Sequence, residues 1–276
     1  SDFREFASFL FGRGKDGLIL ALEAYFDDAG THDDADVVVW GGFVGSVSQW
    51  AKLDAEWRAR RDKPFDAPEH FRPPLPRFHL SNCAMRRKEF EGFTQPESDS
   101  LQYEFRKIIA ESGVVGVAYG IDRRAYDRIV VDPEAREFLG DAEQACFGSC
   151  FRGAFQQARK HYPDETEMAL AFDWISNPTR KAKLASIAER VEQPPDSIPQ
   201  IAGIFWGKTA SLMPLQAADV MATENYWAAQ AFIAGRDFNE RPHMAHFLRN
   251  VECVGYIMRE QEIRDYMRKY GYEPAT

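Results

Sequence analysis

The stretch Leu22-Glu23-Ala24-Tyr25-Phe26-Asp27 decides the interpretation of this chain, because a run of strand-forming residues leads directly into an aspartate. The same arrangement recurs at Met168-Ala169-Leu170-Ala171-Phe172-Asp173. Both stretches predict β-strands that end at an acidic residue. A third aspartate, Asp219, lies in the first turns of an apolar stretch that predicts a helix. Carboxylates placed in this way can converge at one edge of a sheet and bind hard divalent cations through oxygen.

Length and composition predict one domain covering residues 1–276, because 276 residues with 45% hydrophobic composition can bury a substantial core and no low-complexity stretch divides them. No apolar run approaches the roughly 18 to 20 residues that span a bilayer. The first residues also lack the basic-then-apolar order of a secretory signal. We therefore expect a soluble cytoplasmic protein without a membrane partner.

Charge and cysteine content narrow the function classes. A net charge of −9 argues against binding of nucleic acid through the overall charge of the protein. Bound cations or local basic clusters can nevertheless make the electrostatic potential positive at a particular site. Four such clusters occur, each of which also fits a solvated helix face: residues 58–61, 86–88, 123–124 and 180–183. Cys146 and Cys150 stand at helical spacing, without a Cys-x-x-Cys pair anywhere, and this predicts a buried reduced pair.

The order of predicted elements indicates an α/β fold. Strands are expected at about 18–27, 37–44, 114–121, 168–173 and 201–207, and helices at about 48–58, 99–112, 141–161 and 178–192 and around Asp219 up to about 234. We expect an insertion at about 48–112, between the strands at 37–44 and 114–121. This insertion contains a proline-rich loop at 64–76. Residues of about 236–276 are expected to form a helical C-terminal extension.

With the insertion removed, the order is three strands, helix, strand, helix, strand, helix, which is that of a ribonuclease H-like mixed five-stranded sheet flanked by helices. The acidic residues then fall where that fold needs them. Asp27 ends the first strand, Glu143 lies near the start of the first core helix, Asp173 ends the fourth strand and Asp219 begins the last helix.

The chain resembles the domain of unknown function 3800 family, a prokaryotic group regarded as ribonuclease H-like. That family opens on a strand ending in Asp-Glu-Ser-Gly and closes on a helix carrying Leu-Gln-Leu-Ala-Asp, and the matching residues here are Asp27-Asp28-Ala29-Gly30 and Leu215-Gln216-Ala217-Ala218-Asp219. The Phe78-His79 pair is also similar to a segment seen in members. The resemblance covers about residues 22–231 and implies a metal-dependent nuclease in a defence or mobile-element context. Two positions depart from the pattern, since Asp28-Ala29 replaces Glu-Ser and Arg77 stands where some members carry an acid.

The chemistry expected of such a site is hydrolysis of nucleic-acid phosphodiester bonds with Mg²⁺ or Mn²⁺. Two cations would bind the scissile phosphate from both sides, with Asp27 bridging them and the other three carboxylates completing the shells. His79 or Lys208 could steady the phosphate or assist proton transfer.

Each assignment has a structural alternative. Asp27 and Asp173 could simply belong to turns, and Glu143 could serve the dipole at a helix start, where Asp141, Asp28 or Glu224 could replace it as the helix carboxylate. His79 could be a structural histidine and Lys208 a solvated loop residue. Asp219, in contrast, lies in an apolar helix, where an unpaired carboxylate is costly to bury.

Two other function classes remain open. A non-catalytic adaptor would keep the fold and bind a protein partner, or dimerise, through the aromatic residues of the insertion, which are Trp50, Trp57, Phe65, Phe71 and Phe78. A strand-transfer enzyme of the transposase kind would need more basic surface than this acidic chain offers. Metal binding separates the nuclease from the adaptor, because an adaptor has no need of converging carboxylates.

Overall fold

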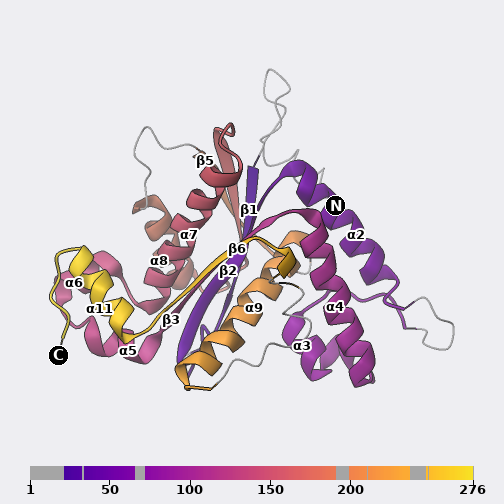
Figure 1. The fold of residues 1–276 in the computed structure, drawn as a ribbon, viewed down its shortest axis with the longest axis horizontal. Coiled ribbons are helices and arrows are strands. Elements are labelled where there is room, and N and C mark those ends of the chain that lie inside the picture. Colours follow the sequence, from indigo (N-terminus) through magenta and orange to yellow (C-terminus); the bar gives the residue numbers. More distant parts are fainter. Residues whose placement is uncertain are drawn as a thin grey trace.

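The computed structural model describes residues 22–32, 34–65, 72–190, 199–209, 211–236, 247 and 249–275. A six-stranded mixed sheet lies at its centre in the order β5-β4-β1-β2-β3-β6 (Figure 1). Its strands are β1 (Leu22–Ala29), β2 (Val37–Ser46), β3 (Val115–Asp122), β4 (Glu167–Asp173), β5 (Gln200–Gly207) and β6 (Cys253–Met258). β2 is antiparallel to both β1 and β3, whereas the pairs β1–β4, β4–β5 and β3–β6 are parallel.

Helices cover both faces of this sheet. They are α2 (Val47–Asp62), α3 (Leu80–Met85), the 3-10 helix η2 (Lys88–Phe90), α4 (Gln95–Ser112), α5 (Arg123–Ile129), α6 (Pro133–Leu139), α7 (Ala142–His161), α8 (Pro178–Arg190), α9 (Met213–Ile233) and α11 (Glu260–Lys269). α7 packs on one face of the central strands and α9 on the other (Figure 1). Each face has its own hydrophobic core.

The alternation of β1 assigns its side chains to these two faces. Ala24 and Phe26 belong to the core under α7, whereas Tyr25 belongs to the core under α9. Successive side chains of a strand point to opposite faces, so Asp27 shares the α9 face with Tyr25, and Asp28 shares the α7 face with Phe26.

The strand order and directions confirm the ribonuclease H-like fold. All five expected strands are present, and β1–β2 form the expected antiparallel hairpin. The expected helical C-terminal extension contains helix α11, but the expectation of five strands is wrong, because Cys253–Met258 forms a sixth strand parallel to β3. A strand at this place pairs the backbone groups of β3, which would otherwise form an open sheet edge.

Two element boundaries differ from expectation around the acidic residues. β1 continues to Ala29, so Asp27 lies inside the strand and not at its end. α9 begins at Met213, with Pro214 in its first turn, and Asp219 therefore lies in the second turn. Asp173 is the last residue of β4, as predicted. The short helices α5 and α6, capped by Asp122 and Asp132, were not predicted.

The segment between β2 and β3 contains α2, α3, η2 and α4, which lie beside α9 (Figure 1). Its aromatic residues are core and not a docking surface, because Trp50, Trp57 and Phe78 have no exposed area and Phe65 is half-buried. Phe71 lies outside the described residues. Burial makes Trp50, Trp57 and Phe78 unavailable to a protein partner.

The structure tests the predictions made for the cysteines and for membrane-spanning segments. Cys146 and Cys150 are buried and not in a disulfide, which confirms the expected reduced pair, and burial raises the pKa of both thiols. None of the described helices has the length and apolar character needed to cross a bilayer. Residues 1–21, which include the first residues of the strand expected at about 18–27, lie outside the described part of the chain.

Candidate active site

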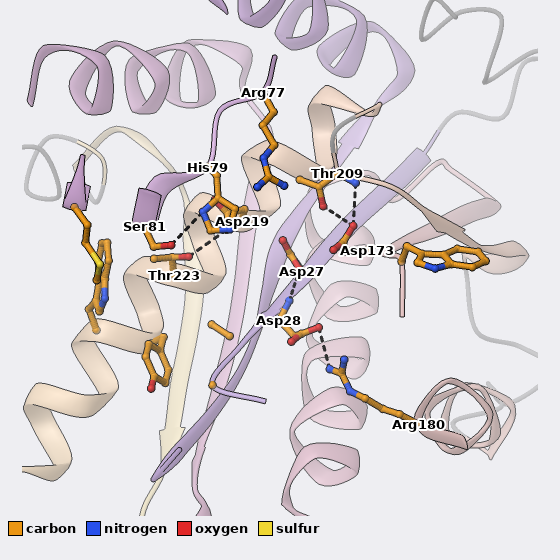
Figure 2. A pocket seen from close by; sticks show the side chains of 16 residues that line it. Asp27, Asp28, Arg77, His79, Ser81, Asp173, Arg180, Thr209, Asp219 and Thr223 are labelled. Carbon is orange, nitrogen blue, oxygen red and sulfur yellow. Dashed lines mark hydrogen bonds and ion pairs between the residues drawn. The ribbon is translucent and has the colours of Figure 1, made fainter. Parts of the chain in front are cut away.

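Four aspartates line one cavity of about 480 Å³: Asp28 and, from three different elements, Asp27, Asp173 and Asp219. The parallel register of β1 and β4 places Phe26 beside Phe172. Successive side chains of a strand point to opposite faces, so the side chains of the next residues, Asp27 and Asp173, both lie on the other face of the sheet. α9 packs on that face and contributes Asp219. In Figure 2, Asp27 lies between Asp219 and Asp173. The structure therefore brings together three of the four predicted carboxylates.

Asp27 is the most electrostatically strained of the three. Its side chain is 8% exposed and accepts a hydrogen bond from the backbone N–H of Asp28 at 2.8 Å. Burial raises its pKa well above the usual range, and the negative charges of Asp219, Asp28 and Asp173 raise it further. A cation in this cavity would relieve these costs, because an opposite charge favours the ionised carboxylate.

The other two aspartates are held by protein donors. Asp219 accepts hydrogen bonds from the backbone N–H of Leu80 at 2.8 Å and from the hydroxyl of Thr223 at 3.3 Å. Burial raises the pKa of Asp219, and His79 is the largest influence that opposes the rise. Asp173 accepts through Oδ1 from the N–H of Thr209 at 2.9 Å and from the hydroxyl of the same residue. These contacts fix the orientation of both carboxylates.

The segment before α3 forms a second wall of the cavity. The side-chain oxygen of Gln216 accepts from the N–H of Phe78 at 2.8 Å and from the indole N–H of Trp57 at 2.9 Å, which ties this segment to α9. His79 then lies with Nε2 3.8 Å from the Asp219 carboxylate. Arg77 also lines the cavity and pairs with Glu89 at 3.1 Å. His79 is thus placed at the site, as predicted.

Glu143 does not line this cavity. It lies in the first turn of α7, near the helix start as predicted, but α7 covers the opposite face of the sheet. Its carboxylate accepts from Nε of Arg180 at 2.7 Å, and Arg180 also pairs with Asp28 at 2.9 Å. Burial raises the pKa of Glu143, and Arg180 opposes that rise. Asp28, on the α7 face, and Glu143 therefore form a second acidic pair that is bridged by a guanidinium.

Three predicted alternatives lie elsewhere. Lys208 is exposed and does not line the cavity. Asp141 caps α7 and pairs with Lys183 at 3.4 Å. Glu224 forms a buried ion pair with Arg106. None of the three faces the three aspartates.

Several lining residues escaped the sequence analysis, notably Thr209, Trp174 and Arg180. Thr209 immediately follows Lys208, and Trp174 immediately follows Asp173, so their proximity to a strand end was the available signal. Arg180 was visible only as a member of a basic cluster. Its approach to Asp28 depends on where α8 docks, which no local pattern encodes.

The chemistry of the cavity's carboxylate oxygens suits a divalent cation. Within the described ranges, no three His, Cys, Asp or Glu side chains form a ready-made metal site. However, Asp27, Asp173 and Asp219 offer the hard oxygen donors that Mg²⁺ and Mn²⁺ favour. Burial, and then the negative charges of Asp219, Asp28 and Asp173, raise the pKa of Asp27, and a bound cation would favour its ionised form.

Comparisons with known proteins find similarity to solved structures only. No protein-family model matches the chain, and no curated protein matches it. The chain is similar to a ribonuclease HIII, Bst-RNase HIII, solved in complex with Mn²⁺, with a TM-score of 0.44 and 14% sequence identity. The match covers 88% of this chain and 65% of that one. The fold assignment rests on the strand order and directions given above.

Proposed function

We propose that this protein is a divalent-metal-dependent nuclease or phosphodiesterase that hydrolyses nucleic-acid phosphodiester bonds. The observation that carries the proposal is the convergence of Asp27, Asp173 and Asp219 in one cavity on a ribonuclease H-like sheet. Their oxygen donors suit a bound cation, which would also favour the ionised form of the buried Asp27. Their placement on rigid strands and a helix suits a preorganised catalytic site.

Asp27, Asp173 and Asp219 would hold one Mg²⁺ or Mn²⁺ ion. The oxygen donors that a second ion would need, Asp28 and Glu143, are paired with Arg180, so the parent would hold one ion. A bound divalent cation supplies electrostatic stabilisation to a phosphate that gains charge during hydrolysis. The donor hydrogen bonds to Asp173 and Asp219 hold these carboxylates in place while the substrate binds.

Two nitrogen-bearing side chains of the cavity would position the substrate phosphate. Arg77 and His79 enter from the segment before α3, opposite Asp173 and Arg180 (Figure 2). His79 lies within reach of Asp219 and is half-buried, with a side-chain exposure of 30%. It would hold or transfer a proton at the leaving oxygen, and Arg77 would bind a phosphate oxygen through its guanidinium.

Family membership is proposed on separate grounds. The stretches Asp27-Asp28-Ala29-Gly30 and Leu215-Gln216-Ala217-Ala218-Asp219 support assignment to the domain of unknown function 3800 family. Gln216 in the second stretch holds the segment that carries His79, which gives this motif a structural role. A role in prokaryotic defence or mobile-element biology would follow from that membership.

Calorimetric titration with Mn²⁺ tests the proposal directly. We expect the parent to bind and both Asp27→Asn and Asp219→Asn to lose binding. Asp141→Asn serves as the matched control, because Asn is also a good helix cap and Asp141 lies outside the cavity. The parent with Mn²⁺ should then cleave labelled DNA or RNA, and the two cavity variants should not. Binding that survives both cavity substitutions would place the metal elsewhere and overturn the proposal.

A further inference from the structure

An exposed indole stands directly beside the three carboxylates. Trp174 follows Asp173, lines the same cavity and is 49% exposed. The other five tryptophans of the chain all lie in the described residues and are buried or half-buried: Trp40, Trp50, Trp57, Trp206 and Trp227. The exposed indole borders the cavity that holds the carboxylates, so its ring can contact a ligand that enters there.

A lysine ammonium accompanies this ring. Nζ of Lys181 lies 4.7 Å from the centre of the Trp174 ring and 5.4 Å from that of Trp206. Within the described residues, no ion pair joins Lys181 to a carboxylate, whereas Arg180 beside it is paired with Asp28 and Glu143. The positive charge of Lys181 is therefore available to an external anion, and the two indole rings hold it next to Trp174, which lines the cavity.

We propose that Trp174 is a stacking platform for one base of a single-stranded nucleic acid, with Lys181 bound to the adjoining backbone phosphate. This inference rests on the proposed nuclease function and names its substrate class. An aromatic face beside a cation is the combination that binds single strands without sequence preference. In a duplex the base faces are stacked on each other and cannot lie on the ring.

The depth of the carboxylates supports the same substrate. Asp27 and Asp219 are 8% and 5% exposed, so a scissile phosphate must enter the cavity to reach them. A flexible single strand can turn one phosphate inward while the neighbouring base remains at the rim. A cavity of about 480 Å³ has room for one such nucleotide unit.

Fluorescence anisotropy with labelled oligothymidylate tests the platform apart from catalysis. Each protein carries Asp27→Asn and is measured with EDTA, so that neither metal nor cleavage contributes. We expect Trp174→Ala to weaken binding by about five-fold to a hundred-fold, the range that stacking of one base gives. Trp174→Phe should retain most of the affinity, because a phenyl ring also stacks. Phe138→Ala is the matched control, since Phe138 is 52% exposed and does not line the cavity.

The outcomes separate the platform from the nuclease. Three outcomes would overturn the inference. The Trp174→Ala protein could bind as tightly as its Asp27→Asn parent, or it could lose as much affinity for a blunt duplex as for the single strand. The third outcome is that oligothymidylate does not bind at all. Mn²⁺-dependent cleavage by the otherwise unaltered chain is measured in parallel. If the protein cleaves but Trp174 does not contribute to binding, the proposed nuclease function stands and the stacking role fails. If Trp174 contributes to binding but the protein does not cleave, the nuclease function fails and the stacking role stands.

Discussion

Arg180 donates from Nε to the Glu143 carboxylate at 2.7 Å, and this contact separates Glu143 from the three aspartates of the cavity. Nη2 of the same guanidinium lies 2.9 Å from Asp28. Burial alone would lower the pKa of Arg180, but its bonds to Glu143 and Asp28 overcome this effect and raise the pKa. Arg180 is therefore a permanent cation at the place where Asp28 and Glu143 would otherwise meet a second metal ion.

Replacing Arg180 should change the number of bound metal ions. We expect the parent to bind one Mn²⁺ ion and Arg180→Gln to bind two, because Asp28 and Glu143 then become free to act as oxygen donors. Calorimetric stoichiometry measures this change. Lys183→Gln is the matched control, since Lys183 lies on the same helix and pairs with Asp141 outside the cavity. A stoichiometry of one in Arg180→Gln would contradict the expectation.

The strand carboxylates were predictable from the sequence because their position depends on short-range rules. Asp27 and Asp173 follow apolar strand residues, and parallel pairing then places them side by side. The partner of Glu143 was not predictable, because it depends on how α8 docks beside α7. Asp219 was predictable in part. Its apolar helix indicated that the carboxylate is buried, but not that it accepts a hydrogen bond from the backbone N–H of Leu80.

The sixth strand shows a similar limit. Cys253–Met258 is a short, mostly apolar run that contains Gly255, and such a run does not by itself distinguish a strand from a packed helix segment. Its strand conformation comes from the backbone groups of β3, which it pairs in parallel. Such long-range pairing overrides weak local preference.

Thr209 should position Asp173. Its N–H and hydroxyl both donate to Oδ1 of Asp173, so Thr209→Val removes one donor at nearly constant volume. Hydrogen bonds to charged groups contribute about 1.5–3 kcal/mol, and we expect the Mn²⁺ affinity to fall about ten-fold as Asp173 loses its orientation. Titration calorimetry checks the affinity. Thr209→Ser retains the hydroxyl and should bind like the parent, so equal losses in both variants would refute the role of this donor.

Asp27→Asn should stabilise the metal-free protein. The pKa of Asp27 is raised by burial and by neighbouring carboxylates, so the ionised side chain is unfavourable in the folded state at neutral pH. A neutral amide of the same shape removes that cost, and we expect a gain of about 1–2 kcal/mol in the unfolding free energy, typical of substitutions at strained functional sites. Urea denaturation at pH 7 with EDTA measures it. A loss of stability would show that the charge of Asp27 is compensated.

Breaking the Arg106–Glu224 pair should cost far more than a surface ion pair. Both side chains are 1% exposed, and the pair joins α4 to the helix that carries Asp219. Glu224→Ala leaves the Arg106 charge buried without its carboxylate, and we expect a loss of about 3–5 kcal/mol in unfolding free energy. The double variant Arg106→Met, Glu224→Leu should recover most of it. A small loss in Glu224→Ala would mean that water reaches Arg106.

Glu23 should make stability depend on pH. Its carboxyl is 2% exposed and accepts from the Tyr25 hydroxyl at 2.9 Å, whereas Oε1 has no hydrogen-bond partner within the described residues. Burial raises its pKa from 4.5 to about 7, against the opposing effect of the Tyr25 hydrogen bond. The folded protein therefore holds this proton more tightly than the unfolded chain, and the unfolding free energy should fall as pH rises from about 4.5 to about 7.

A Glu23→Gln variant isolates this effect, because the amide keeps the shape and cannot ionise. Integrated over the pKa shift, the Glu23 contribution lost between pH 4.5 and pH 8 amounts to about 3 kcal/mol. We therefore expect Glu23→Gln to exceed the parent by that amount in urea denaturation at pH 8 and to match it near pH 4.5. Parallel pH profiles of the two proteins would show that Glu23 keeps an ordinary pKa in the folded state.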